Sequence, residues 1–148
     1  MREISLKGIT LLKELESFRA TCYKDDELLK IGYGTLIDSE NERKLLNKTI
    51  TPEEAEDYLF DDLIPIQNQI NRLVKTPLSQ NEFDALVLFC YNVGLNAFKN
   101  STLLKLLNTT PRPNLRNEFL RWVYAGKKKC DGLVNRRTKE VNLFYGNY

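Results

Sequence analysis

The sequence predicts an α+β protein whose strands are confined to the N-terminal third of the chain. Between Cys22 and Ile37, β-type residues are interrupted by Asp25-Asp26-Glu27 and by two glycines, a pattern typical of a hairpin or short meander. Elsewhere apolar residues recur at helical spacing between capping, proline and glycine signals. The chain has 148 residues, of which 42% are hydrophobic, and this fits one domain that needs neither disulfides nor a metal to fold.

The first helix is expected over residues from about 4 to 18. Its apolar residues fall on one side of a helical wheel, and they are Ile4, Leu11, Leu12, Leu15 and Phe18. The hairpin follows it, and a polar, turn-rich stretch from Asp38 to Lys48 comes next.

A long helix is expected to begin at Pro52. Thr51 is placed to cap it and Glu54 to complete a capping box, while proline is well suited to the first helical position. Helical spacing continues to Val74, with a kink or break expected at Pro65, where proline removes an interior hydrogen bond. Such a helix is long enough to join two lobes.

The rest of the chain predicts further helices. Ser79 and Glu82 form a second capping box, and Gly94 is placed to end the helix that follows. Short helices are expected from about 101 to 108, 114 to 125 and 134 to 144.

The absence of histidine excludes several classes of enzyme. Ser-His-Asp and Cys-His catalysis and zinc sites with histidine ligands all need an imidazole. The three cysteines lack a C-x-x-C pair and are interpreted as free thiols, with Cys90 as a small buried hydrophobe. Acid–base chemistry must therefore come from Asp, Glu, Lys, Tyr or Cys, and carboxylates are the leading candidates.

Charge and hydropathy also limit the partners. With 22 basic and 20 acidic residues the net charge is +2, which is too small for a dedicated nucleic-acid binder. No stretch approaches the ~20 apolar residues of a membrane span, and the N-terminus has no secretory pattern. We expect synthesis and folding in the cytoplasm. The run from Lys127 to Lys129 is interpreted as a solvated loop, with attraction to an anionic wall polymer as the alternative.

One segment differs from the other places where carboxylates occur. From Glu14 to Asp25, an acidic helix end meets an acidic β-turn beside a strand punctuated by glycine, which could form a cleft. Glu16 and Asp25 would cooperate across a sugar ring only if the strand between them folds back. The helical wheel does not choose between Glu14 and Glu16, since both flank the apolar stripe.

These residues resemble a known family. Glu16-Ser17-Phe18-Arg19, Tyr23-Lys24-Asp25 and Ile31-Gly32-Tyr33-Gly34 are similar to the active-site segment of phage-type lysozymes, the endolysin muramidases of glycoside hydrolase family 24. The likeness continues in order through five further segments: Thr51-Pro52-Glu53-Glu54-Ala55, Asp84-Ala85-Leu86 with Tyr91-Asn92-Val93-Gly94, Ser101-Thr102-Leu103, Trp122, and Gly132-Leu133-Val134-Asn135-Arg136-Arg137.

The resemblance implies a lysozyme-like fold: an N-terminal lobe with a β-sheet (about 15–60), a connecting helix (about 52–75) and a helical C-terminal lobe (about 76–148 with the first helix). A cleft between the lobes would bind bacterial peptidoglycan. The resemblance also assigns Glu16 as general acid and Asp25 as the residue that orients the attacking water. No metal or organic cofactor is implied, and we expect a monomer that reaches the cell wall, in the periplasm, after release from the host cytoplasm.

Further positions carry over from the resemblance. Leu36, Tyr91 and Ser101 match positions that line the sugar-binding cleft, with ordinary core or capping roles as the alternative. Arg136 matches an arginine that pairs with the catalytic glutamate, and its alternative is a solvated helix charge.

Several positions depart from the family pattern. Lys30 stands where a threonine usually helps to hold the water, and the turn after Asp25 is one residue short. An ammonium directed into the site would oppose proton donation by Glu16. Alternatively, the shorter turn rotates Lys30 outward and brings another group, or Asp26 in place of Asp25, to the site. Ser17 stands at a position where the family usually has glycine. Thr35 stands where the family commonly has histidine, so the ion pair of that histidine is lost here.

The leading hypothesis is a muramidase that hydrolyses the β-1,4 bond between N-acetylmuramic acid and N-acetylglucosamine, with Glu16, Asp25 and Lys30 as catalytic residues. The alternative is a catalytically impaired lysozyme-fold module that binds peptidoglycan without cleaving it. A nucleic-acid-binding helical protein is the least favoured hypothesis.

Overall fold

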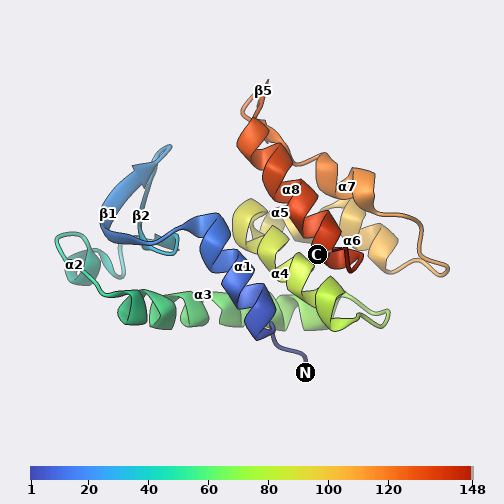
Figure 1. The fold of residues 1–148 in the computed structure, drawn as a ribbon, viewed down its shortest axis with the longest axis horizontal. Helices are drawn as coiled ribbons and strands as arrows, with labels where there is room; N and C mark the ends of the chain where they lie inside the picture. Colours follow the sequence, from blue (N-terminus) through green and yellow to red (C-terminus); the bar gives the residue numbers. More distant parts are fainter. Residues whose placement is uncertain (148) are drawn as a thin grey trace. The chain divides into compact units, whose positions relative to one another are not determined.

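The computed structural model describes residues 1–147, whose contacts form two compact units: residues 10–64, and residues 1–9 with the chain from Pro65 onward. The unit boundaries fall inside helix α1 (Leu6–Glu16) and helix α3 (Pro52–Leu73). The predicted α+β class is confirmed, with most of the chain helical and a small antiparallel sheet near its start (Figure 1).

The unit of residues 10–64 is built on a three-stranded antiparallel sheet. Its order is β1 (Arg19–Asp25), β2 (Leu28–Gly32) and β3 (Thr35–Leu36), as the hairpin pattern predicts. A single turn of helix, α2 (Glu42–Leu45), lies in the stretch predicted as turns. The sheet, α2 and the start of α3 share a small apolar core: Ile31, Ile37, Leu45, Ile50 and Ala55.

Helix α3 begins as predicted. The Thr51 hydroxyl accepts from the Glu54 backbone N–H at 3.1 Å, and Glu54 accepts from the Thr51 backbone N–H at 3.2 Å. That backbone hydrogen bond lowers the pKa of Glu54. The helix continues through Pro65 to Leu73, so a break at Pro65 is wrong. One missing hydrogen bond is offset by the buried face of the helix, which includes Leu63 and Ile66 on either side of the proline.

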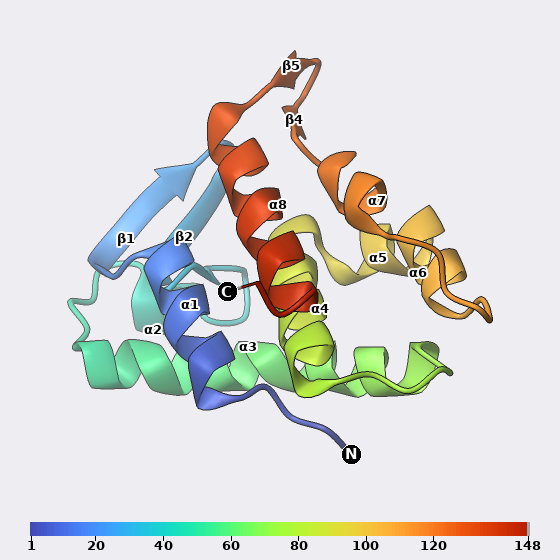
Figure 2. The ribbon, with the colours of Figure 1, turned by 45° about the vertical axis from the view of Figure 1, so that its right-hand side comes forward.

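The other unit is organised around helix α4 (Gln80–Val93). Ser79 and Glu82 form the predicted capping box, and Gly94 ends the helix at a φ of 95°. Residues 83 to 90 are all buried, and α4 packs against α8 (Asp131–Phe144) (Figure 2). Burial raises the pKa of the Cys90 thiol well above its usual range, in agreement with its interpretation as a buried hydrophobe.

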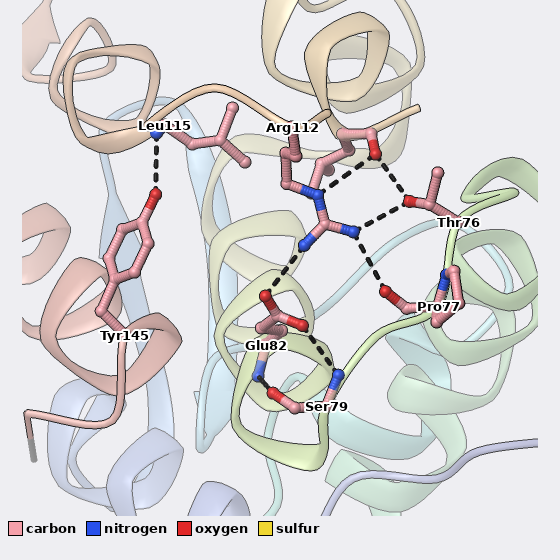
Figure 3. A network of polar contacts seen from close by, with 8 residues as sticks. Thr76, Pro77, Ser79, Glu82, Arg112, Leu115 and Tyr145 are labelled. Atoms are coloured by element: carbon pink, nitrogen blue, oxygen red, sulfur yellow. Dashed lines mark hydrogen bonds and ion pairs between the residues drawn. The ribbon is translucent and has the colours of Figure 1, made fainter. Parts of the chain in front are cut away.

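Three short helices complete this unit: α5 (Leu95–Lys99), α6 (Thr102–Leu107) and α7 (Arg116–Leu120). The Arg112 guanidinium joins them to the start of α4 by donating to Glu82 and Thr76 (both 2.8 Å) and to the Pro77 carbonyl (3.0 Å) (Figure 3). The Tyr145 hydroxyl accepts from the Leu115 backbone N–H at 2.8 Å in the same view.

The prediction that strands are confined to the first third is wrong. A second antiparallel ribbon pairs β4 (Tyr124–Ala125) with β5 (Lys128–Lys129), and it connects α7 to α8 (Figure 2). Strands of two residues carry no periodicity, so the sequence pattern does not reveal them. The helix predicted from 114 to 125 is correspondingly short, while α8 begins at Asp131, three residues before its predicted start.

Candidate active site

Glu16 is the last residue of α1, and the chain turns immediately after it. Ser17 has a φ of 59°, the left-handed conformation that favours glycine, and its backbone N–H donates to the Lys13 carbonyl at 2.9 Å. This helix-ending geometry explains why glycine is usual at the position that Ser17 occupies. The turn directs the chain from Glu16 straight into β1.

Strand β1 is irregular between Glu16 and Asp25. Arg19 pairs with Gly32 and Tyr23 with Lys30, so four steps along β1 match two steps along β2, a bulge of two extra residues. Bulges bend a strand and increase its twist. The segment between the two acids is therefore not a straight strand.

Lys30 and Asp25 form an ion pair. The Lys30 Nζ lies 2.8 Å from Asp25 Oδ2, with 24% and 56% of the two side chains exposed. The strand register explains the contact. Lys30 is opposite Tyr23, and Asp25 lies two residues beyond Tyr23 on the same face of β1, so the pair is a diagonal cross-strand contact. Lys30 is thus directed toward Asp25, whereas Asp26 occupies the turn at a φ of 54°.

Tyr23 is a residue of the site that sequence reasoning missed. Burial raises the pKa of its phenol; the charges of Glu16 and Asp25 raise it further, while those of Lys30 and Arg19 oppose the rise. The Arg19 guanidinium lies 4.6 Å from the centroid of the Tyr23 ring. Strand alternation from Asp25 would have placed Tyr23 on the same face.

Thr35 and Asp62 meet beneath the sheet, in the unit of residues 10–64. The buried Thr35 hydroxyl donates to Asp62 Oδ2 at 2.7 Å. Burial raises the pKa of Asp62, and the hydrogen bond from Thr35 opposes that shift only in part. The side chain at position 35 therefore still holds Asp62, although it supplies no cation.

The predicted sugar-binding residues lie in both units. Leu36, in β3 of the first unit, is 42% exposed. Tyr91 lies half-buried on α4 of the second unit. The Ser101 hydroxyl caps α6, accepting from the Leu104 backbone N–H at 3.1 Å and donating to the Phe98 carbonyl at 2.6 Å. Its capping role is confirmed, and contact with sugar stays a prediction for all three.

Arg136 belongs to a buried charge cluster on α8. Its Nε donates to Glu140 Oε2 at 3.1 Å and a terminal nitrogen donates to the Leu88 carbonyl at 2.9 Å. Arg137 Nη1 lies 3.2 Å from Glu140 Oε1, and a second terminal nitrogen donates to Asn92. The alternative of a solvated charge at Arg136 is wrong, because only 7% of the residue is exposed. Pairing of Arg136 with Glu16 stays a prediction.

Residues 1–147 contain no group of three His, Cys, Asp or Glu side chains arranged to hold a metal ion. Within the same residues, no helix has both the length and the apolar character that crossing a membrane requires.

Comparison with known proteins decides the family. The sequence model of the phage lysozyme family matches residues 13–140. The chain belongs to the phage lysozyme family. Among its relatives, the endolysin of Salmonella phage P22 is 37% identical over 145 residues, covering 97% of this chain and 99% of that protein. The endolysin of Bacillus phage PZA is 41% identical over 145 residues, or 96% of this chain.

The match in structure extends over the same range. The solved muramidase domain of SpmX from Asticaccaulis excentricus aligns with a TM-score of 0.86 and 33% identity, covering 97% of this chain and 98% of that chain. This confirms the lysozyme fold. The chain spans only 55% of the length of the PZA endolysin, about half of that relative.

Proposed function

We propose that this phage lysozyme is a muramidase that cleaves the β-1,4 bond between N-acetylmuramic acid and N-acetylglucosamine in bacterial peptidoglycan. One observation carries the proposal. Glu16 ends α1 where the chain enters the bent strand that carries Asp25, and both carboxylates act on the phenol of Tyr23. Glycoside hydrolysis typically uses a pair of carboxyl groups that flank the scissile bond.

The proposed roles follow from the chemistry of the bond. Protonated Glu16 donates its proton to the oxygen that leaves as the glycosidic bond breaks, and positive charge develops on the sugar ring. Asp25 accepts a hydrogen bond from a water on the opposite face; as that water attacks the ring, its proton passes to the Asp25 carboxylate. Asp25 Oδ2 is held by Lys30, so Oδ1 is the oxygen we assign to the water.

Lys30 is a positioning residue in this scheme. Its ammonium restrains the Asp25 carboxylate through a charge-assisted hydrogen bond, which is shorter and stronger than a neutral one. It replaces the hydroxyl that other members of the family place before the Ile-Gly pair. Tyr23 stands opposite Lys30 in the ladder and confines the lysine side chain from the neighbouring strand.

The remaining roles are also part of the proposal. Leu36, Tyr91 and Ser101 contact the glycan, and Arg136 orients Glu16. Ser101 already donates its only hydroxyl proton to Phe98, so it can only accept a hydrogen bond from a sugar. The chain acts as a monomer, uses no metal or organic cofactor, binds no nucleic acid, and reaches the cell wall after synthesis in the host cytoplasm.

The test compares two glutamates of the same helix. Wild type and Glu14→Gln should clear outer-membrane-permeabilised Gram-negative cells, whereas Glu16→Gln should be slower by about 10²–10⁴-fold, the usual contribution of a general acid. Mass spectrometry of digested sacculi identifies the bond that is cut. Equal loss in both variants would remove Glu16 as the acid, and sacculi bound without release of muropeptides would mean a binding module instead.

A further inference from the structure

A pocket of about 600 Å³ opens beside the β4–β5 ribbon, and all its lining residues belong to the second unit. A volume of this size lies in the range of small-molecule sites. We call it the ribbon pocket, and its chief lining residues are Asn117, Leu120, Arg121, Val123, Tyr124 and Lys129. None of the roles proposed above uses it.

The register of the ribbon orients two of these side chains. Tyr124 is directly opposite Lys129, so both project from the same face of the ladder, and both line the pocket. Ala125 is opposite Lys128, and this pair projects from the other face. Tyr124 is 58% exposed, which leaves its aromatic ring accessible to a ligand.

The lining residues carry two cations and no acid. The Nε of Arg121 lies 3.0 Å from Glu118 Oε2, and the arginine side chain is 67% exposed. Glu118 balances the charge of Arg121, so the surplus positive charge of the pocket comes from Lys129. The neighbouring Lys127 and Lys128 add to the positive potential outside it, while Asp131 reduces it.

These groups together suit a sugar that carries an acid group. An aromatic ring packs against the apolar face of a pyranose, and the Asn117 amide can donate to or accept from sugar hydroxyls. Lys129 and the terminal nitrogens of Arg121 can donate charge-assisted hydrogen bonds to the oxygens of one anionic group of the ligand. Leu120 and Val123 provide an apolar floor beside them.

We propose that the ribbon pocket binds one sugar–phosphate unit of an anionic, phosphodiester-linked glycopolymer of the bacterial wall. The sugar ring lies on Tyr124, and the phosphodiester lies on Lys129 and Arg121. A polymer with repeated phosphates also gains from the lysines outside the pocket, which a single carboxylate would not. The site is independent of the chemistry at Glu16 and would hold the proposed muramidase on its wall substrate.

The test uses two lysines of one strand. Purified Gram-positive sacculi, either intact or stripped of phosphate polymers by hydrofluoric acid, are the probes, and binding is measured at low salt in the Glu16→Gln background. Lys129→Gln should weaken binding to intact sacculi by about tenfold, as expected for a lost charge-assisted contact. Lys128→Gln, on the opposite face, should weaken it by less than about twofold. Tyr124→Ala should cost about fivefold.

Stripping the sacculi should abolish the difference between the Lys129 and Lys128 variants. Equal losses in these two variants on intact sacculi would overturn the proposal, because they would show diffuse attraction and no defined site. A Lys129 effect that survives stripping would overturn it as well, since the acid group would then lie on the peptidoglycan. Release of muropeptides by wild type from stripped sacculi tests the proposed function separately.

Discussion

Two groups of oppositely charged side chains in this chain differ in burial. Asp25 and Lys30 meet on an exposed face of a hairpin. Arg136, Arg137 and Glu140 meet inside the other unit, where both Arg137 and Glu140 are completely buried. An exposed pair contributes little to folding and can serve to position a side chain, whereas breaking a buried ion pair is costly because water cannot replace the lost interaction. Burial therefore separates a pair that can be broken at little cost to stability from a cluster on which folding depends.

The largest effect is expected at Glu140. Glu140→Gln removes the acceptor charge shared by two buried guanidinium groups and should lower the free energy of unfolding by about 3–5 kcal/mol. Urea denaturation followed by circular dichroism measures the change. Glu56→Gln, which breaks the more exposed pair with Lys13, is the matched control and should cost less than about 1 kcal/mol. Similar costs for the two variants would contradict the role assigned to burial.

Breaking the exposed pair should affect catalysis more than folding. Lys30→Met should change the free energy of unfolding by less than about 1 kcal/mol. It should slow muropeptide release about fivefold, the rate equivalent of a contact worth about 1 kcal/mol. Lys30→Arg keeps the charge and should retain most of the rate. A faster Lys30→Met enzyme would mean that the ammonium opposes catalysis.

Asp62 sharpens the comparison because it is half-buried and its hydrogen-bond partner is the neutral Thr35 hydroxyl. Its pKa is raised in the folded chain, so the folded state binds its proton more tightly than the unfolded state does. The stability that this proton provides is complete at low pH and is lost as the pH rises through the folded pKa. Asp62→Asn, which is neutral at every pH, should therefore raise the melting temperature at pH 7 by about 2–4 °C.

The pH dependence is the control for Asp62. Below about pH 3 the wild-type carboxyl is protonated in both states, and the advantage of Asp62→Asn should disappear. Differential scanning calorimetry at several pH values measures it. An advantage that is constant with pH would exclude titration of Asp62 as its cause.

The smallest effect is expected at Ser17, in the turn between the two candidate catalytic elements. Ser17→Gly should raise the free energy of unfolding by about 0.5–1 kcal/mol, because glycine adopts the left-handed conformation without strain from a Cβ atom. Ser17→Ala keeps the Cβ atom and should bring no such gain. Thermal unfolding of both variants distinguishes relief of strain from loss of the hydroxyl.

Local chemistry accounts for what the sequence predicted correctly. Helices α3 and α4 begin where Thr51 and Ser79 cap them, since a capping box involves only residues three positions apart. The hairpin follows from glycines and acidic turn residues within a short segment. The same local signals also predict that Glu16 lies near the end of a helix, next to that hairpin.

Only the tertiary structure decided the rest. The sequence alone left the direction of Lys30 open, because strand register depends on a partner strand and on the bulge in β1. It left Arg136 open between a paired and a solvated side chain, because burial is set by elements far away in the chain, here α4. Local hydrogen bonds, such as those of a capping box, depend on neighbouring residues and can be predicted from the sequence. Strand register and the burial of charged side chains are set only when distant segments pack together.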